Sequence, residues 1–370
     1  MIRVPFVDLK AQYESIKPEI DAAVSNVIGE TAFIGGKYVR EFEEKFSALY
    51  GVKNVVSCAN GTDSLYIIMK SLGIKAGDEV ITVANSWISS SETITQTGAK
   101  PVFVDVDPVY YSINESQIEN AITTNTKAII LVHLQGQMAD VGKISEICKK
   151  HRLFLIEDCA QSHFSEFEGK RAGLFGIAGS FSFYPGKNLG AYGDAGCIIT
   201  DDDELAQKCR MYANHGALKK HHHIMEGINS RMDGIQAAIL TTKLPYILQW
   251  TEARIRNAAR YGEVLKGIPQ IVLPKVRENT KHTFHLYVIQ AEKRDALAEY
   301  LKENGIETAI HYPTALPSLP CYAYLGKAAE DYPVATAFQS KILSLPMYPE
   351  LTEEQIKYVA DNIKRFYQGQ

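Results

Sequence analysis

One lysine follows a short segment in which serine and phenylalanine alternate. Residues 180–196 read SFSFYPGKNLGAYGDAG, and Lys187 is the only cationic residue among them. The Pro-Gly pair before the lysine predicts a turn, and the glycines after it let backbone approach a ligand closely. An ammonium group beside apolar surface has a lowered pKa, so its neutral amine becomes available to attack a carbonyl and form a Schiff base. A solvated loop lysine is the alternative interpretation, because most lysines are exposed.

An acidic pair stands at the end of the apolar run before this segment. Residues 153–163 read LFLIEDCAQSH, in which four apolar residues predict a strand buried on both faces and the acids follow at its carboxyl end. Open α/β sheets bind ligands at that edge. A carboxylate such as Asp158 can keep a pyridine nitrogen protonated there, which is what a pyridoxal phosphate (PLP) electron sink requires. A helix cap or a turn is the alternative for one acid taken alone.

Together the two segments resemble the DegT/DnrJ/EryC1/StrS family of PLP-dependent sugar aminotransferases. The motifs are EDCAQ at 157–161 and SFYPGKNLG at 182–190, and the similarity extends over nearly all of the chain. The resemblance implies that Lys187 forms the Schiff base with PLP. It also implies that Asp158 pairs with the pyridine nitrogen and that Gln161 hydrogen-bonds the phenolic oxygen of the cofactor.

The elements that must position these residues alternate between apolar strands and amphipathic helices. This alternation predicts an α/β chain whose mostly parallel sheet has helices on both faces. The resemblance implies a fold-type I, aspartate aminotransferase-like large domain over residues 1–247 and a small α+β C-terminal domain over residues 248–370. Within the small domain the pattern predicts a strand at 286–289, a helix at 296–304, a strand at 308–311 and a final helix from Thr352.

A second strand-to-helix turn, ANGTDS at residues 59–64, is a candidate phosphate site. Free backbone N–H groups and the positive end of the helix dipole meet at such a turn. Gly61 and Thr62 are the candidate phosphate ligands; an ordinary loop with Thr62 or Asp63 as the N-cap is the alternative. By the resemblance, this turn holds the PLP phosphate and Ser182 adds its hydroxyl.

Further residues are assigned by their matched positions. Trp87, placed by the pattern at the start of a helix, is expected to stack on the pyridine ring, with a core tryptophan as the alternative. The resemblance places Tyr184, His311 and Tyr312 at the substrate, whereas interface packing is the alternative. It also implies that Asn229 crosses to the PLP phosphate of a partner subunit, so a homodimer with composite active sites is expected.

No metal site is expected from the histidines and cysteines. The run KKHHH at 219–223 has adjacent histidines that point in different directions, with no carboxylate or cysteine at ligand spacing, so a polar loop is the prediction. His133 is interpreted as a structural histidine. The six cysteines contain no C-x-x-C pair, which favours buried reduced thiols.

Composition excludes several classes of protein. The chain has 370 residues, 46% of them hydrophobic, which allows two to three domains with a large core. With 39 basic and 43 acidic residues the formal charge is -4, and no basic run indicates a nucleic-acid partner. No apolar stretch approaches the ~18 residues of a membrane span. A cytoplasmic protein without nucleic-acid or membrane partners is therefore expected.

The resemblance implies an aminotransferase whose substrates are a nucleotide-linked keto sugar and an amino donor, glutamate in most relatives. The motifs around Lys187 resemble members that aminate C3 of dTDP-linked 3-keto-6-deoxyhexoses more than members that act at C4. A C4 or 2-acetamido C3 sugar, an aminocyclitol, and a noncatalytic sugar-binding regulator on the same fold remain alternatives. A sugar 3-dehydratase of this fold would have histidine at the lysine position, so Lys187 argues against it.

Overall fold

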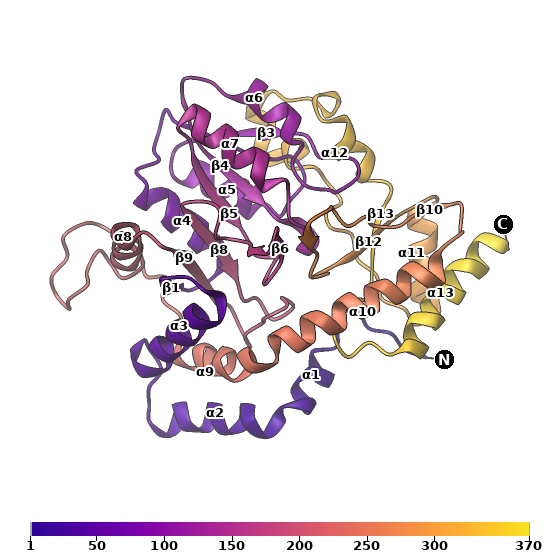
Figure 1. Ribbon diagram of the computed structural model, residues 1–370, viewed down its shortest axis with the longest axis horizontal. Helices are drawn as coiled ribbons and strands as arrows, with labels where there is room; N and C mark the ends of the chain where they lie inside the picture. The colour runs from indigo at the N-terminus through magenta and orange to yellow at the C-terminus, as the bar shows by residue number, and fades with distance from the viewer. Residues whose placement is uncertain (1, 370) are drawn as a thin grey trace.

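A seven-stranded sheet forms the centre of the larger part of the protein in a computed structural model, which describes residues 2–369 (Figure 1). The strand order is β1-β9-β8-β5-β4-β2-β3, and β9 is antiparallel to both of its neighbours while the other pairs are parallel. The α/β prediction with a mostly parallel sheet is confirmed. The strands are β1 (Asn54–Cys58), β2 (Glu79–Val83), β3 (Lys100–Val104), β4 (Thr126–Val132), β5 (Phe154–Asp158), β8 (Ala178–Ser182) and β9 (Gly196–Thr200).

Helices connect these strands and pack against the sheet (Figure 1). Their apolar residues recur at helical spacing; in α3, for example, Phe42, Phe46 and Tyr50 are buried along one face. Two parallel strands must be joined by a crossover connection, which is usually a helix, so the parallel pairing of the strands explains why helices lie between them. The helices of this part are α1 (Leu9–Ser15), α2 (Lys17–Gly29), α3 (Gly36–Tyr50), α4 (Gly61–Ser71), α5 (Ser89–Gln96), α6 (Ile118–Ala121), α7 (Val141–His151), α8 (Asp203–Ala213) and α9 (Gly234–Lys243).

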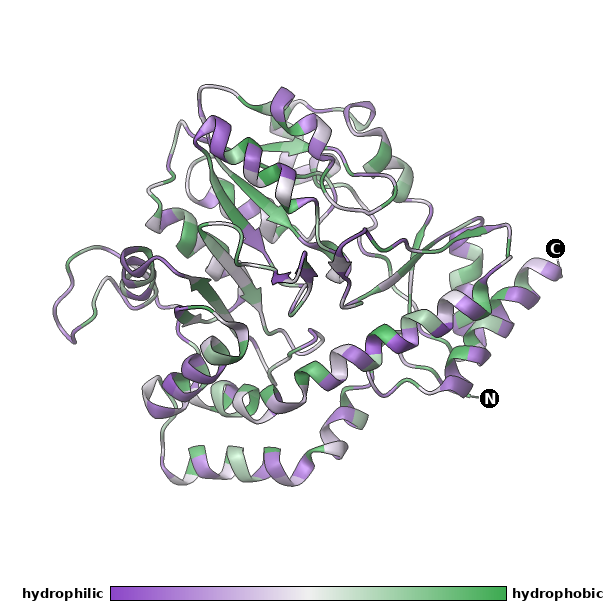
Figure 2. Cartoon of the chain, viewed as in Figure 1, coloured by the Kyte–Doolittle hydropathy of each residue, from purple (hydrophilic) through white to green (hydrophobic). Residues whose placement is uncertain are grey.

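The long helix α10 (Ile247–Leu265) leads from the large sheet to a second group of elements, where both ends of the chain lie (Figure 1). Hydrophilic and hydrophobic residues alternate along α10 and α13, as expected for helices with one face buried (Figure 2). Thr352 caps α13 and forms a capping box with Gln355, which explains the predicted start of that helix. The elements are β10 (Ile271–Val272), β12 (Tyr287–Ala291), α11 (Arg294–Glu303), β13 (Ile342–Leu345) and α13 (Glu353–Gln368), with α12 (Pro333–Phe338) packed on the large part.

Two hydrophobic cores correspond to these two groups of elements. The chain crosses between them more than once: Val4 lies in the core of the second group, whereas Leu316, Tyr322 and Phe338 lie in the core of the first. Asp105 accepts hydrogen bonds from the first turn of α12, which fixes this returning segment on the large part. A domain boundary after residue 247 remains a prediction.

Two predicted elements differ from the structure. The strand predicted at 308–311 is only an isolated bridge between Ala309 and Ser344, because the chain pairs with β13 at one residue and then turns toward the large sheet. Helix α5 begins at Ser89 rather than at Trp87, so the tryptophan precedes the helix and is free of its packing face.

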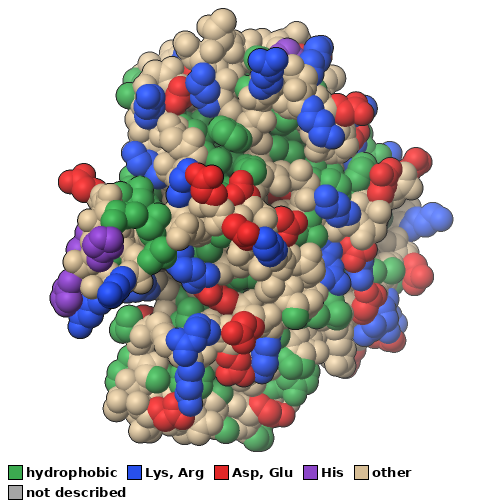
Figure 3. All heavy atoms as spheres, turned by 60° about the vertical axis from the view of Figure 1, so that its left-hand side comes forward, with side chains coloured by type: hydrophobic (Ala, Val, Ile, Leu, Met, Phe, Trp, Pro, Cys, Tyr) green, Lys and Arg blue, Asp and Glu red, His purple; other side chains and the backbone are tan. Residues whose placement is uncertain are grey.

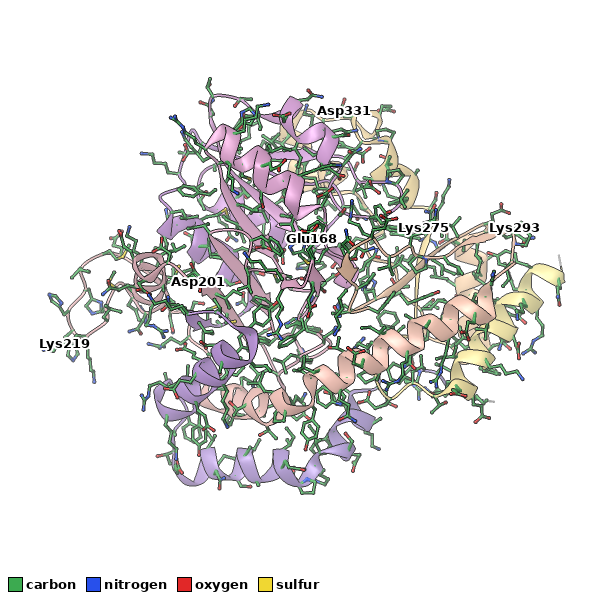
Figure 4. All side chains as sticks on the ribbon, in the orientation of Figure 1. Glu168, Asp201, Lys219, Lys275, Lys293 and Asp331 are labelled. Carbon is green, nitrogen blue, oxygen red and sulfur yellow. The ribbon has the colours of Figure 1, made fainter. Side chains whose placement is uncertain are left out.

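The loop after α8 projects away from the rest of the chain, with Lys219 near its tip (Figures 1 and 4). Its three consecutive histidines, at 221–223, are exposed, and Figure 3 shows histidine side chains beside apolar ones on this projection. Among residues 2–369 no helix has the length and apolar character needed to cross a membrane. Two short strands, β6 (Glu166–Phe167) and β7 (Lys170–Arg171), form a hairpin that β11 (Thr280–Lys281) extends.

Candidate active site

A cavity of about 640 Å³ lies at the edge of the sheet where β1, β2, β5 and β8 end. The carboxyl ends of parallel strands meet at one edge, so residues far apart in the sequence converge there. The second group of elements contributes a further wall through His285 and Leu286, just before β12, and through His311 and Tyr312, just after the bridge at Ala309. Of the residues assigned from the sequence, those that line the cavity are Gly61, Thr62, Trp87, Asp158, Gln161, Ser182, Tyr184, Lys187, His311 and Tyr312.

Lys187 reaches the cavity from a tight turn after β8. Its backbone N–H donates to the carbonyl oxygen of Tyr184 at 2.8 Å, which closes the predicted Pro-Gly turn. Gly190 packs on the same turn, since an added Cβ would lie 2.2 Å from the carbonyl oxygen of Pro185. Burial lowers the pKa of the Lys187 amine from 10.5 to about 8, against the opposing charge of Asp158. The amine therefore loses its proton at a lower pH than the amine of an exposed lysine does.

Asp158 is the last residue of β5, because the strand continues through both acids rather than ending before them. One carboxylate oxygen accepts from the backbone N–H of Ala160 at 3.1 Å and the other from the Ser90 hydroxyl at 3.2 Å. Burial raises the pKa of Asp158, and the Ala160 N–H, Lys187 and Ser90 act in the opposite direction. The side chain is thus a desolvated carboxylate with an opposite charge in the same cavity.

The far end of the cavity contains hydrogen-bond donors. Helix α4 begins at Gly61, and the Asn60 side chain is its N-cap, accepting from the N–H of Asp63 at 2.8 Å. The alternative N-caps Thr62 and Asp63 are therefore wrong. Gly61 packs directly on β8, where an added Cβ would lie 2.6 Å from the Cβ of Ser182. This contact brings the helix N-terminus and the Ser182 hydroxyl together, as an anion site requires.

The hydroxyl of Thr62 lies 2.7 Å from that of Ser89, in the first turn of α5. Two helix starts and three hydroxyl-bearing residues, Thr62, Ser89 and Ser182, therefore face one end of the cavity. Such a group of neutral donors suits a phosphate monoester.

Gln161 bridges two parts of the protein. Its Oε1 accepts from the backbone N–H of Gln135 at 2.6 Å, and its Nε2 donates to the hydroxyl of Tyr312 at 2.9 Å. Burial raises the pKa of that hydroxyl, so Tyr312 stays protonated. The predicted hydrogen bond of Gln161 to the phenolic oxygen of the cofactor remains a prediction.

The aromatic residues of the cavity form its mouth. The rings of Trp87 and Tyr312 lie with centroids 5.8 Å apart and an angle of 44° between their planes. Trp87 and Tyr184 are each 59% exposed, which contradicts the alternative of a core tryptophan and leaves both side chains accessible to a ligand. Stacking of Trp87 on a bound ring remains a prediction.

Several residues in or next to the cavity wall were not identified from the sequence. Ser86 and Ser90 share a hydrogen bond of 2.8 Å, and Ser90 is the residue that contacts Asp158. The serine run at 89–91, which begins a helix, was the available signal, because serines at a helix start are typical of caps and ligand sites. His285, which also lines the cavity, had no such signal.

Asn229 does not line the cavity of its own chain. It is exposed, forms an isolated bridge with Asn214, and lies at the base of the projecting loop. Its predicted contact with a partner subunit therefore remains a prediction.

A buried cluster on another side of the sheet resembles a metal site in composition. His133, Glu157 and Cys159 have potential ligand atoms within 4.8 Å of one another. However, Glu157 accepts from His133 Nε2 at 2.9 Å and from three backbone N–H groups, those of Gly173, Phe175 and Gly176. His133 Nδ1 accepts from the N–H of Ala139. These bonds occupy both residues, in agreement with the structural interpretation of His133.

The chain was compared with known proteins and families. The sequence model described as "DegT/DnrJ/EryC1/StrS aminotransferase family" matches residues 14–364. A protein of Geobacillus stearothermophilus named "Pleiotropic regulatory protein" is 46% identical over 99% of both chains. A "UDP-N-acetyl-3-dehydro-alpha-D-glucosamine 3-aminotransferase" of Acidithiobacillus ferrooxidans is 41% identical over 99% of this chain and 98% of its own length. A "dTDP-3-amino-3,6-dideoxy-alpha-D-galactopyranose transaminase" of Aneurinibacillus thermoaerophilus is 41% identical over 98% and 99%.

A solved structure gives the same picture. DesV of S. venezuelae, in complex with a ketimine intermediate, superposes with a TM-score of 0.97 and 38% identity, and the match covers 99% of each chain.

The cavity fits PLP, the cofactor on which members of this family depend. The fit is seen in the donor set: a helix N-terminus held close to Ser182 by Gly61, a desolvated carboxylate at Asp158, and an amine of lowered pKa at Lys187. These groups match the phosphate, the ring nitrogen and the aldehyde of PLP, respectively.

Proposed function

The chain belongs to the DegT/DnrJ/EryC1/StrS aminotransferase family, and from this premise we propose that it transfers an amino group from glutamate to C3 of a dTDP-linked 3-keto-6-deoxyhexose. That it is a PLP-dependent sugar aminotransferase follows from the family and its relatives. The sugar, its nucleotide and the amino donor are the proposed part.

One observation supports this function most strongly. Lys187 and Asp158 line the same cavity, and their charges influence each other's pKa. A transaminase needs an amine that bonds the cofactor aldehyde and a carboxylate that holds the ring nitrogen positive.

Each residue then has a defined task. PLP, when bound, stores the amino group between the two substrates and accepts electron density from the reacting carbon. Lys187 would hold the cofactor through its amine and, as a free amine, would move the proton as a general base and acid. Asp158, which accepts hydrogen bonds from Ser90 and Ala160, would hold the ring nitrogen in its protonated form. Gly61, Thr62 and Ser182 would bind the phosphate.

The choice of C3 has more support than the choice of nucleotide. Both sugar-specific relatives named above carry an amino or keto group at C3 in their names, one on a dTDP sugar and one on a UDP sugar. We choose the dTDP-linked 6-deoxyhexose because of the motif around Lys187. The UDP-linked 2-acetamido sugar is the second candidate, on the strength of the equally similar relative.

A panel of substrates tests this proposal. Protein loaded with pyridoxamine phosphate is mixed separately with dTDP-linked 3-keto and 4-keto 6-deoxyhexoses and with a UDP-linked 2-acetamido-3-keto sugar. We expect the dTDP-linked 3-keto sugar to restore the visible absorption of lysine-bound PLP fastest and to gain an amino group by mass. Restoration by the 4-keto sugar alone would contradict the C3 assignment, and restoration by the UDP sugar alone would contradict the nucleotide.

The noncatalytic regulator is favoured by one observation, the regulatory name of the relative from Geobacillus stearothermophilus. Sugar binding alone has no use for a lysine of lowered pKa opposite a buried carboxylate. The same panel separates the two, because a protein that only binds a sugar returns it without an amino group.

We also propose a homodimer in which Asn229 of each subunit reaches the phosphate site of the other. Apolar side chains gather beside the projecting loop: Ile34 and Leu218 are 60% and 50% exposed and share a hollow of about 370 Å³ with Arg231 (Figure 3). Exposed apolar patches of this kind are typical of interfaces between copies. Asn229 is exposed on the same projection.

Mixing two inactive variants tests this arrangement. We expect Lys187→Ala and Asn229→Asp to be nearly inactive alone, and to regain activity when the two chains are refolded together. In a mixed dimer, one active site contains both substitutions and the other contains neither, so the second site is expected to be active. Absence of any recovery in a mixture shown to contain mixed dimers would contradict the shared site.

A further inference from the structure

His285 lines the cavity and lies on the segment between β11 and β12. The segment is fixed against the loop after β4: the N–H of Thr283 donates to the Gly136 carbonyl oxygen at 3.1 Å. Gly136 has a φ of +96°, and an added Cβ would lie 2.8 Å from the Thr283 hydroxyl oxygen and 3.1 Å from the N–H nitrogen of His285. Only glycine allows this approach, so the backbone position of His285 is tightly set.

The ring of His285 has one nitrogen committed and one free. Asn188 donates through Nδ2 to the carbonyl oxygen of Thr283 at 3.3 Å, which assigns its Oδ1, 3.1 Å from His285 Nδ1, as an acceptor. Nδ1 therefore carries the proton, and Nε2 is an acceptor. Within the described part of the chain, the hydrogen bond of the His285 ring is the one at Nδ1, and the side chain is partly exposed in the cavity wall.

The charge state of this ring follows from its surroundings. Burial lowers the pKa of His285 well below its ordinary value, and the positive charges of Lys187 and Arg254 act in the same direction, as do the neighbouring His311 and His163. A neutral imidazole with a protonated Nδ1 can accept through Nε2 but cannot donate there.

The position of His285 relates it to the reacting carbon. Its partner Asn188 directly follows Lys187 in the chain, so the ring is tied to the backbone next to the reactive amine. The tyrosine and serine hydroxyls of the cavity can donate to carbonyl, phosphate or carboxylate oxygens. Nε2 of His285, in contrast, can accept a hydrogen bond from a ligand group that donates one, such as a hydroxyl.

We propose that Nε2 of His285 accepts a hydrogen bond from a hydroxyl beside the reacting carbonyl of the keto sugar, and so determines specificity in the sugar half of the reaction. This inference rests on the proposed function. The carboxylates of the amino donor offer no proton to this nitrogen, so His285 discriminates between the two substrates of one site. It is a substrate-contacting residue and takes no part in proton transfer at carbon.

The test measures the two half-reactions separately in His285→Asn and His285→Gln. Asparagine retains an amide near the Nδ1 position and loses the Nε2 acceptor, whereas glutamine reaches the Nε2 position. We expect His285→Asn to react with the keto sugar about 10-fold more slowly, and His285→Gln to recover part of the loss, since one buried hydrogen bond to a neutral group has this value. Reaction with glutamate is expected to change less than about twofold.

A binding measurement without the cofactor gives a second readout. The aminated sugar nucleotide is titrated into PLP-free protein by calorimetry, with analogues that lack the hydroxyl at C2 or at C4. Wild-type protein is expected to bind one of the two deoxy analogues about 10-fold more weakly than the intact sugar. His285→Asn is expected to bind that analogue and the intact sugar with similar affinity. The wild-type titrations do not depend on the folding of any variant.

His282→Asn is the matched control. His282 lies on the same segment, is buried against Phe284, and does not line the cavity. Its Nδ1 accepts from the N–H of Phe284 at 2.9 Å, a bond that asparagine can replace. We expect this variant to retain both half-reactions.

Three results would overturn the proposal: equal slowing of both half-reactions in His285→Asn, unchanged reaction with the sugar, or wild-type binding that is insensitive to both missing hydroxyls. If instead wild-type protein aminates none of the sugars, the proposed function itself fails. The two failures are therefore distinguishable.

Discussion

Replacing Lys187 with alanine is expected to lower the rate of transamination by ~10⁴-fold or more, because the variant loses both the covalent attachment and the proton-transferring amine. The variant is expected to remain folded, since the lysine side chain lines the cavity. The measurement is the rate of each half-reaction, with the visible absorption of lysine-bound PLP followed in parallel. That absorption should be absent in Lys187→Ala.

Lys187→Arg is the matched control for charge. Arginine keeps a cation opposite Asp158 but stays protonated, so it cannot attack an aldehyde. We expect both variants to be inactive to a similar degree. An active Lys187→Arg would show that the positive charge, rather than the nucleophilic amine, supports the reaction, and the account would be wrong.

Asp158→Asn is the second variant with a large expected effect. The amide keeps the shape of the side chain but removes the negative charge that holds the ring nitrogen protonated, so carbanion stabilisation weakens. One preorganised electrostatic contact of this kind contributes about 10²- to 10³-fold in rate. The rate of proton removal from glutamate measures it. An unchanged rate would contradict the role of Asp158.

Ser90→Ala provides a graded comparison for Asp158. The Ser90 hydroxyl donates to the carboxylate at 3.2 Å, and its removal leaves the Ala160 N–H as the remaining donor. The pKa of Asp158 then rises further, and we expect a loss of about 10-fold, consistent with one hydrogen bond to a charged group. A loss as large as that of Asp158→Asn would indicate that the serine acts in another way.

The central sheet was predictable because its strands are short apolar runs between amphipathic helices. The four apolar residues before Glu157 predict a strand, and β5 (Phe154–Asp158) lies there. The strand expected at 308–311 was wrong. The apolar side chains of this segment are partly buried by packing between the two cores, and its backbone pairs with β13 only at one isolated bridge. The return of α12 to the large core had no local signal, because the contact with Asp105 joins residues about 230 positions apart.

The candidate site divides in a similar way. Lys187, Asp158 and Gly61 stand in motifs with local chemistry, so the sequence indicates them. The roles of Ser90 and His285 depend on their hydrogen-bond partners, Asp158 and Asn188, which lie 68 and 97 residues away in the chain. The three-dimensional fold brings these partners together, so the spacing of residues in the sequence does not predict the contacts.

The chain contains a second amine that sharpens the test of the central assignment. Lys243 is buried, and burial lowers the pKa of its amine to about 8, as for Lys187. Its Nζ, however, donates to the carbonyl oxygen of Gly190 at 2.7 Å and lies 4.3 Å from the ring centre of Tyr192, outside the lining of the cavity. A lowered pKa alone therefore does not identify the cofactor lysine, whereas access to the cavity does.

Borohydride reduction of the PLP-loaded protein, followed by peptide mass mapping, tests this most directly. Reduction fixes the cofactor permanently to whichever amine holds it. We predict a single modified peptide with the phosphopyridoxyl group on Lys187, and an unmodified Lys243. Modification of Lys243, or of no lysine in protein that has bound PLP, would contradict the account.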